Sequence, residues 1–202
     1  MISTLIIILS FLLGSIPTGY IIGKTIAGLD IRKIGSGNIG ATNVFRVLNK
    51  KMGVFVLVID ILKGIGPCLI ANIFISQFEF VLVCAIAAVV GHNWTPWLLF
   101  KGGKGVATSL GAVLGISIIE PSLFQAVGVL FLIWIITFLI FRIVSVSSIL
   151  TAFFLPLALP FFSDSEKRPY ILIFAIILGF MIVLKHVPNI RRVIKGEEKR
   201  LL

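Results

Sequence analysis

The feature that most constrains this chain is a series of apolar runs, each about as long as a lipid bilayer is thick. Runs of about 20 residues, the length that a membrane-crossing helix needs, are found at 2–22, 53–75, 122–141, 143–162 and 169–187. Only 13% of the 202 residues are charged and 58% are hydrophobic, whereas a soluble domain has roughly 25% charged residues. The sequence therefore predicts an all-α, polytopic integral membrane protein and excludes a soluble globule.

Two shorter apolar runs, at 78–91 and 105–119, decide the number of membrane crossings. Each has about 13 to 15 residues, which barely crosses the hydrocarbon core. If both cross, the chain has about seven transmembrane helices, with its N-terminus outside and its C-terminus in the cytoplasm. Fifteen of the 18 Lys and Arg residues then lie on the cytoplasmic side, as the positive-inside rule requires. These fifteen are Lys24, Arg32, Lys33, Arg46, Lys50, Lys51, Lys101, Lys104, Arg142, Lys185, Arg191, Arg192, Lys195, Lys199 and Arg200.

The rest of the composition points to a single membrane domain over residues 1–202. No charged residue precedes the first apolar run and no cleavage pattern follows it, so residues 2–22 predict a retained span. Cys68 and Cys84 lie within apolar runs without metal-ligand spacing and are expected to be inert buried thiols. A net charge of +10 would suggest nucleic acid in a soluble protein. Here the basic residues cluster between apolar runs, so no nucleic-acid partner is expected.

The first polar segment, residues 35–46, reads GSGNIGATNVFR and is too rich in small and polar residues to be a membrane helix. Its glycines, Gly35, Gly37 and Gly40, spell a dinucleotide-binding pattern, but no strand precedes them, so that reading is rejected. Successive glycines let backbone N–H groups converge on an anion. The side chains that could add donors or charge are Ser36, Asn38, Thr42, Asn43 and Arg46. The segment is either a phosphate-binding loop or a turn that carries the chain over the bilayer surface.

The second polar segment, residues 100–108, reads FKGGKGVAT and opens the apolar run at 105–119. The start of a helix favours a phosphate, because its N–H groups are free and its dipole is positive there. Lys104 would add charge, and the neighbouring candidates are Lys101, Gly102, Gly103 and Gly105. The spacing is not that of a Walker A loop, and a flexible turn with interfacial lysines is the alternative. Just upstream, Trp94 and Trp97 are interpreted as membrane-interface anchors, and His92 as interfacial.

The third polar segment closes the last apolar run, where His186 and Asn189 stand three residues apart. On a helix these two side chains share a face, and both can hydrogen-bond hydroxyl or phosphate oxygens. The Arg and Lys residues that follow are more simply explained as a tail that obeys the positive-inside rule.

Polar residues also occur inside the apolar runs. Asp60 and Lys63 would each cost roughly 3 kcal/mol at mid-membrane if unpaired, so an ion pair is expected, in either a structural or a direct site role. Ser145 opens the run at 143–162 together with two further serines. Its hydroxyl either bonds the helix backbone or points into the site.

In this order on one chain, these segments closely resemble the bacterial acyl-phosphate-dependent glycerol-3-phosphate acyltransferase family. The resemblance covers nearly the whole chain. It is carried by residues 35–46, by Asp60 with Lys63 and Gly64, by GHNWTPWLLFKGGKGVAT from Gly91, and by His186, Asn189, Gly196 and Glu198.

The resemblance implies transfer of a fatty acyl group from acyl phosphate to the sn-1 hydroxyl of glycerol 3-phosphate. The products would be lysophosphatidic acid and inorganic phosphate, in the first step of phospholipid biosynthesis, with no metal or other cofactor. By similarity, the catalytic residues would be Ser36, Arg46, Lys104, His186 and Asn189, and Glu198 would be a structural acid. We expect a monomer in the bacterial inner membrane, in contact with membrane lipids, glycerol 3-phosphate and a long-chain acyl phosphate, with its active site at the cytoplasmic face.

The mechanism expected from the residues is alignment of the acceptor hydroxyl and neutralisation of the leaving phosphate. The base is left open between His186 and a substrate phosphate, and a covalent acyl-Ser36 intermediate is less attractive. The competing function is a membrane transporter of phosphate or glycerol phosphate, since basic groups at helix ends also build permeation sites. The absence of a visible repeat argues mildly against a transporter.

Overall fold

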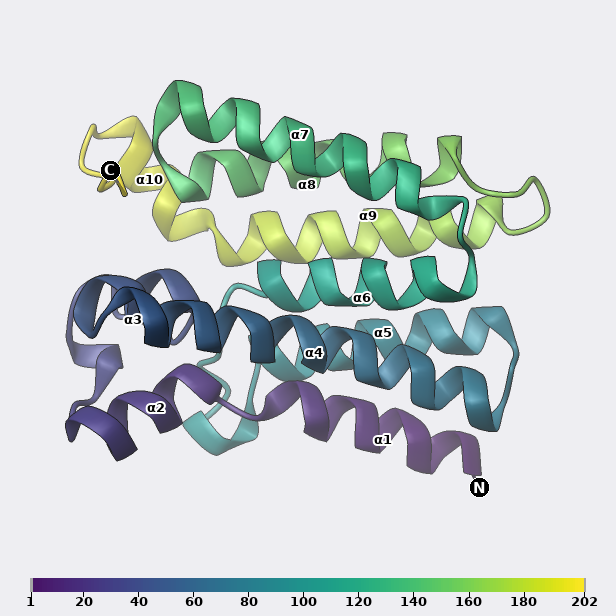
Figure 1. The fold of residues 1–202 in the computed structure, drawn as a ribbon, viewed down its shortest axis with the longest axis horizontal. Coiled ribbons are helices and arrows are strands. Elements are labelled where there is room, and N and C mark those ends of the chain that lie inside the picture. The colour runs from purple at the N-terminus through teal and green to yellow at the C-terminus, as the bar shows by residue number, and fades with distance from the viewer. Residues whose placement is uncertain (1, 202) are drawn as a thin grey trace. The chain divides into compact units, whose positions relative to one another are not determined.

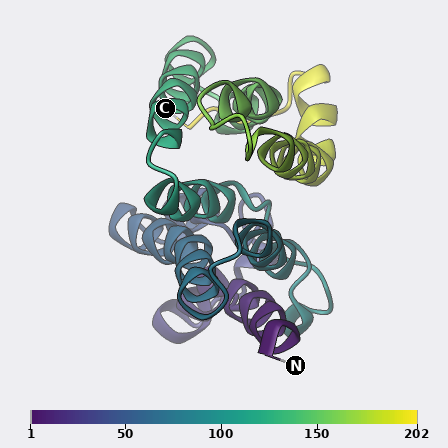
Figure 2. The same ribbon diagram turned by 90° about the vertical axis from the view of Figure 1, so that its right-hand side faces the viewer.

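A computed structural model describes residues 2–201, in which every regular element is a helix. The chain divides into two compact units, residues 1–116 and 117–202. Within each unit the long helices lie roughly alongside one another, as the end-on view of Figure 2 shows.

The first unit begins with α1 (Ile2–Ser15) and α2 (Thr18–Ala27), followed by short η1 (Ile31–Lys33) and α3 (Ala41–Val47). Three further helices, α4 (Lys50–Phe74), α5 (Phe78–Asn93) and α6 (Val106–Ile119), follow, with the short turn η2 (Pro96–Leu98) between α5 and α6. α1 packs mainly on α5, and α4 packs on both α3 and α5 (Figure 1).

Close helix crossings in the first unit depend on glycines. A Cβ on Gly14 of α1 would lie 2.0 Å from the Ala88 carbonyl oxygen of α5, and one on Gly111 of α6 would lie 1.9 Å from the Ile61 carbonyl oxygen of α4. Small residues of this kind let membrane helices approach backbone to backbone. The helices that carry the polar loops are therefore packed tightly against one another.

The first apolar run is not one straight helix. It was expected to span residues 2–22 continuously, but α1 ends at Ser15 and α2 continues at an angle of 41°. The cause is Pro17, which lacks a backbone N–H and interrupts the hydrogen-bond ladder. Thr95 Oγ1 donates to the Ser15 carbonyl at 2.5 Å and Lys63 Nζ donates to the Ile16 carbonyl. These donors replace the missing backbone partners, as apolar surroundings require.

The second unit consists of α7 (Leu123–Phe141), α8 (Val144–Phe161), α9 (Arg168–Lys185) and the short α10 (Val187–Ile194). α8 packs between α7 and α9, and α10 contacts α8 and α9. Before the start of α9, Lys167 forms an ion pair with Glu120, whose carboxylate also accepts a hydrogen bond from the Ser122 hydroxyl. The hydrogen bond from Lys167 lowers the pKa of Glu120, and the same contact raises the pKa of Lys167.

Five helical segments of residues 2–201 are long and apolar enough to cross a membrane: α4, residues 78–98, α7, α8 and α9. The bent pair α1–α2 makes a sixth if it counts as one span. α6 has 14 residues, which at 1.5 Å per residue is about 21 Å and shorter than a hydrocarbon core of about 30 Å. Only 17% of the apolar window of α7 is buried, so its surface suits lipid. The chain is an all-α integral membrane protein with five to six candidate spans.

Candidate active site

The first polar loop connects η1 to α3 and is shaped by one buried side chain, Asn43. The Asn43 amide donates to the carbonyls of Ile31 at 3.0 Å and Ile34 at 3.2 Å, while its oxygen accepts from the Ser36 N–H at 2.8 Å. Gly35 faces this amide with φ +67°, and a Cβ there would lie 2.3 Å from Asn43 Oδ1. Only glycine meets both conditions without strain.

Asn43 was expected among the phosphate-binding residues, but its side chain lies inside the loop and is 1% exposed. Asn38 also stabilises the loop from within, because its Oδ1 accepts a hydrogen bond from the Gly40 N–H at 2.9 Å just before α3 begins. Ser36 and Arg46 are thus the polar side chains of this loop that lie at the surface, and Asn38 and Thr42 are half-buried.

The second polar loop lies against the last turn of α5. The Gly103 N–H donates to the His92 carbonyl at 3.0 Å. A Cβ on Gly102 would lie 2.1 Å from that carbonyl oxygen, and one on Gly105, where φ is +78°, would lie 2.5 Å from Asn93 Oδ1. The glycines are thus required because the loop backbone packs directly on α5.

α6 starts immediately after this loop, with the Ser109 N–H donating to the Gly105 carbonyl at 2.7 Å. Lys104 precedes the first residue of the helix and is half-buried, while Lys101 is exposed. The arrangement therefore has a lysine and a glycine-rich backbone at the positive end of an apolar helix, where an anion is stabilised.

Behind the second loop lies a buried polar cluster on α4 and α5. Lys63 Nζ donates to Asp60 Oδ1 at 2.7 Å, and their side chains are 6% and 3% exposed. His92 Nδ1 lies 4.0 Å from the same oxygen. The predicted Asp60–Lys63 ion pair is present, and the His92 ring lies next to it. His92 was expected at the membrane interface, but it is 5% exposed, because the second loop covers its ring.

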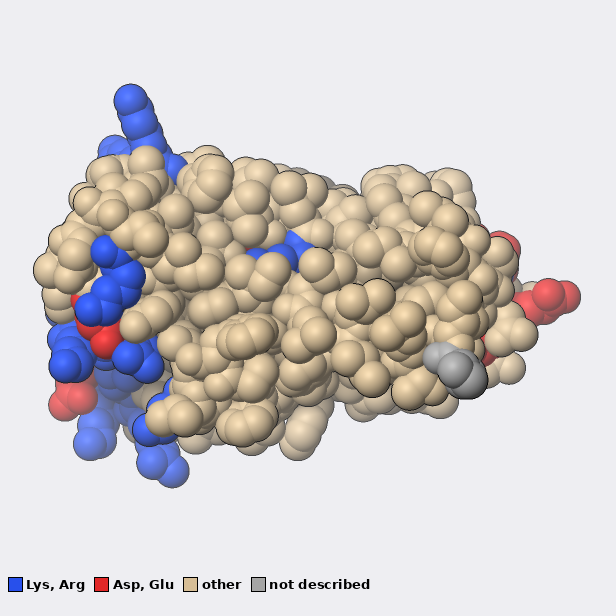
Figure 3. All heavy atoms as spheres, turned by 90° about the horizontal axis from the view of Figure 1, so that it is seen from below, with Lys and Arg blue, Asp and Glu red and all other residues tan. Residues whose placement is uncertain are grey.

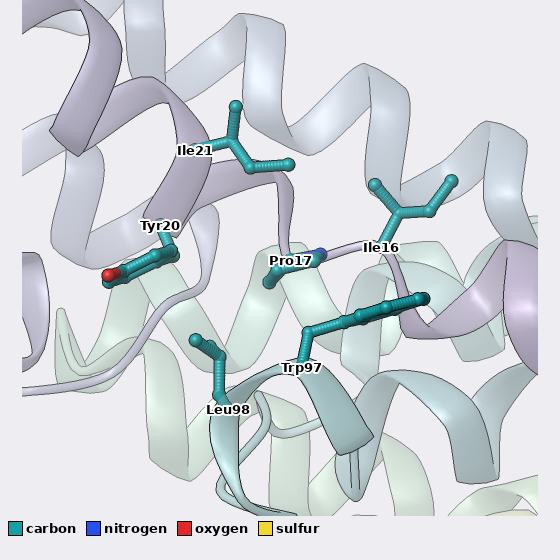
Figure 4. Close-up of a pocket in the computed structure, with 6 residues that line it drawn as sticks. All are labelled: Ile16, Pro17, Tyr20, Ile21, Trp97 and Leu98. Atoms are coloured by element: carbon teal, nitrogen blue, oxygen red, sulfur yellow. The ribbon is translucent and has the colours of Figure 1, made fainter.

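Trp97, which was predicted to anchor the membrane interface, lies on η2 with 62% of its surface exposed. Its Nε1 donates to Ser15 Oγ at 2.9 Å, next to the break between α1 and α2. The indole lies beside an open apolar groove of about 330 Å³, whose lining residues are drawn in Figure 4. The groove is lined by Ile16, Pro17, Tyr20, Ile21, Trp97 and Leu98.

The third polar segment belongs to the second unit and centres on Glu198. This carboxylate accepts from Ser145 Oγ at 2.8 Å, from Asn189 Nδ2 at 2.5 Å and from Arg192 Nε at 2.6 Å. Burial raises the pKa of Glu198, but the donors from Arg192, Asn189 and Ser145 outweigh that effect, so the pKa lies below its usual value. Glu198 thereby ties the C-terminal segment to α8 and α10.

His186 lies at the junction where α9 ends and α10 begins, and it is 2% exposed. Its Nδ1 is 2.8 Å from the Ile182 carbonyl oxygen. The Asn189 backbone N–H donates to the His186 carbonyl at 2.8 Å. The two residues therefore sit in one capping turn, but the Asn189 side chain is directed to Glu198.

Within the first unit, α2, α3 and the start of α4 lie at one end (Figure 1). Lys and Arg side chains gather at the end where α2 and α3 lie (Figure 3). The basic residues of these elements and of η1 are Lys24, Arg32, Lys33 and Arg46. This end of the unit is therefore suited to anionic ligands. Among residues 2–201, no three His, Cys, Asp or Glu side chains are grouped so that they could hold a metal ion.

The fold defines an all-α integral membrane protein, and its glycine-rich, basic loops are of a kind that suits anions. The sequence model of the family described as glycerol-3-phosphate acyltransferase matches residues 4–196. A glycerol-3-phosphate acyltransferase of Prochlorococcus marinus is 43% identical over 98% of this chain and 96% of its own length. One of Desulforamulus reducens is 43% identical over 98% and 95%.

Two solved structures agree with this assignment. Both are crystal structures of PlsY, an integral membrane glycerol 3-phosphate acyltransferase. Its glycerol 3-phosphate form has a TM-score of 0.86 at 38% identity over 99% of this chain and 96% of that chain. Its lysophosphatidic acid form has a TM-score of 0.86 at 37% identity over 99% and 95%. The chain belongs to the PlsY glycerol-3-phosphate acyltransferase family, and it is an enzyme.

Proposed function

We propose that this enzyme transfers a fatty acyl group from a long-chain acyl phosphate to the sn-1 hydroxyl of glycerol 3-phosphate. The observation that carries the proposal is the position of Lys104 and the glycine backbone at the N-terminal end of α6. A helix N-terminus with a neighbouring lysine favours a phosphate group. The family model covers residues of both units, which supports a single acyltransferase domain. The related crystal forms with glycerol 3-phosphate and lysophosphatidic acid support the acceptor and the product.

In the proposed reaction the acceptor oxygen attacks the acyl carbonyl carbon and forms the ester bond. The bond between that carbon and the phosphate oxygen breaks, and its electron pair leaves with inorganic phosphate. The hydroxyl proton passes to a base, which is either His186 or a phosphate monoester with a second pKa of about 6. Because the donor is already activated, the protein mainly aligns the reactants, which can supply roughly 7–11 kcal/mol.

The proposed division of labour follows the three polar segments. Lys104 and the amides of the second loop would hold one phosphate, with Lys101 nearby. Ser36 and Arg46 would bind the other substrate, since both side chains are exposed beside the glycine turn. The roles of His186 and Asn189 rest on the family motif, with Ser145 and Glu198 supporting the turn that carries them.

The proposed topology has seven spans, with the N-terminus outside, the C-terminus in the cytoplasm and the active site at the cytoplasmic face of the inner membrane. Its support is the charge asymmetry of the sequence. It requires the short α6 to act as a span. Single-cysteine variants at Lys33 and Glu166, treated with a membrane-impermeant maleimide in intact cells, test it. Labelling is expected only at residue 166, and labelling at residue 33 would reverse the orientation.

The activity is tested by mixing purified protein with palmitoyl phosphate and glycerol 3-phosphate and measuring lysophosphatidic acid and released phosphate. Ser36→Ala, Arg46→Ala and Lys104→Ala should each lower turnover by about 100-fold or more, the scale of losing a transition-state contact. Lys51→Ala, which changes an exposed lysine at the start of α4, is the matched control. No product, combined with uptake of glycerol phosphate into proteoliposomes, would favour the transporter instead.

A further inference from the structure

We propose that His92 is a positioning residue that sets the shape of the Gly102–Gly105 loop, and that Asp60 and Lys63 hold its ring from behind. This inference rests on the proposed function, in which that loop binds a substrate phosphate. His92 touches no reacting atom in this account and acts through the loop backbone.

The His92 ring leaves no room for a side chain at Gly103. A Cβ added to Gly103 would lie 2.1 Å from His92 Nε2 and 3.0 Å from both Cδ2 and Cε1. All three nearest atoms belong to the imidazole, so the ring fills the space on the side of Gly103 that a side chain would occupy. The Gly103 N–H also donates to the His92 carbonyl. The same residue thus fixes the loop through its backbone and through its side chain.

The opposite edge of the ring faces the buried ion pair. His92 Nδ1 lies 4.0 Å from Asp60 Oδ1, which accepts from Lys63 Nζ at 2.7 Å. Lys63 also donates to the Ile16 carbonyl at the break between α1 and α2. Ionisable groups inside a membrane are costly and usually serve function. Here hydrogen bonds join the helix break to Lys63 and Lys63 to Asp60, and the His92 ring lies between Asp60 and the loop.

The position of the loop matters because Lys104 directly follows Gly103. A shift of about 1 Å in a substrate-positioning element can cost about 100-fold in rate. Without the imidazole, the loop around Gly103 would lose its side-chain support and shift into the space that the ring leaves, carrying Lys104 with it. The expected defect is weaker binding of the phosphate held by this loop, while the other substrate is affected less.

The first test compares the kinetic constants of His92→Ala with those of Lys104→Ala, whose residual turnover is measured at high enzyme concentration. His92→Ala should raise the KM of the same phosphate substrate as Lys104→Ala, by about 10-fold, and change the other KM by less than about 3-fold. His92→Gln, which keeps a polar planar group, should restore part of the difference. Thermal unfolding of each purified variant in detergent shows whether the fold is intact.

The second test is a double-mutant cycle that isolates the ring contact. Gly103→Ala alone should lower kcat/KM by about 100-fold, because the new methyl group meets the imidazole. In the His92→Ala background the same substitution should cost less than about 3-fold, because the space is then open. Gly102→Ala is the matched control: its Cβ would meet the His92 carbonyl and the Asn93 backbone, so His92→Ala should not rescue it.

The outcomes separate the two proposals. If Lys104→Ala retains wild-type constants, the phosphate role of the loop is wrong. If Lys104→Ala is impaired but His92→Ala behaves as wild type, the phosphate role of the loop stands and only the positioning role proposed for His92 is wrong. Additive effects of Gly103→Ala and His92→Ala would also overturn it, and so would an equal rise in both KM values with a lowered unfolding temperature. Should His92→Ala not fold, the same cycle is run with His92→Gln in its place. Additive effects of His92→Gln and Gly103→Ala on kcat/KM would then overturn the positioning role.

Discussion

The two glycine-rich loops of the first unit hold their shapes in different ways. The first is organised by Asn43, whose three partners lie 7, 9 and 12 residues away in the sequence. The second rests on the end of α5 and on a cluster that reaches back to Asp60 on α4. The first loop is held by its own hydrogen bonds in addition to its packing on α2 and α4. The second loop depends instead on its packing against α5.

This difference predicts how each loop responds to damage. The first loop should keep its form as long as the residues from η1 to α3 remain together. The second should be sensitive to changes in α4 and α5 that lie well away from it. Each loop should therefore have its own free energy of local opening, which amide hydrogen exchange measures residue by residue.

The largest effect is expected from Lys63→Met, which leaves Asp60 without its buried partner and the Ile16 carbonyl without its donor. Removing one member of a buried ion pair costs about 3–5 kcal/mol, and that loss should appear in unfolding by denaturant in mixed micelles. The amides of residues 102–105 should exchange faster, while those of residues 34–37 stay protected. Lys51→Met, at the exposed start of the same helix, should change neither.

Replacing both members of the pair provides the sharper comparison. Asp60→Leu together with Lys63→Met should be less damaging than Lys63→Met alone, because no uncompensated charge remains. The Ile16 carbonyl still lacks its donor, so recovery should be incomplete. If the double variant were the more damaged one, the pair would be stabilising in its own right, and the second loop would depend on it even more strongly.

A smaller effect, confined to the first loop, is expected from Asn43→Ala. It removes three hydrogen bonds of about 1 kcal/mol each, so about 2–3 kcal/mol of stability should be lost within the first loop. Exchange should accelerate at residues 34–37 and remain unchanged at residues 102–105. Turnover should fall about 100-fold through misplacement of Ser36. Asn38→Ala, which removes one bond to the Gly40 N–H, is the matched control and should be several times milder.

The sequence predicted the helical membrane class and all three polar segments, because apolar run length and glycine spacing are local signals. The Asp60–Lys63 pair could also be predicted, since i, i+3 spacing and the cost of unpaired charges act within one helix. The break after Ser15 could have been suspected from Pro17, which is a local signal as well.

The side chains that shape the loops could not be predicted in the same way. Asn43 looks like a ligand-binding residue in the sequence, because it is a polar residue in a glycine-rich segment. Nothing in the sequence shows that the loop closes around its amide. His92 looks interfacial because it ends an apolar run, and only the packing of residues 102 and 103 on α5 buries it. Glu198 and Ser145 are 53 residues apart, so their contact requires the folded second unit.

The smallest effect concerns Asp30, which precedes η1 and belongs to the support of the first loop. Its carboxylate accepts from Arg32 Nε at 2.9 Å and from the Arg32 backbone N–H at 3.1 Å, and the Arg32 guanidinium lies over the Tyr20 ring. The hydrogen bond from the Arg32 side chain lowers the pKa of Asp30 from 3.8 to about 2. Since the pKa is depressed in the folded state, the contribution to stability is present above pH 3.8 and disappears as the pH falls toward 2.

Amide protection at Arg32 and Lys33, corrected for intrinsic exchange, should therefore decline across this pH window. Asp30→Asn should remove the decline and alter turnover at neutral pH by less than about 3-fold, because exposed ion pairs contribute little. The second loop should not respond to this substitution. A marked change at residues 102–105 would mean that the two loops are coupled after all, and that the local support of the first loop is not sufficient to explain its shape.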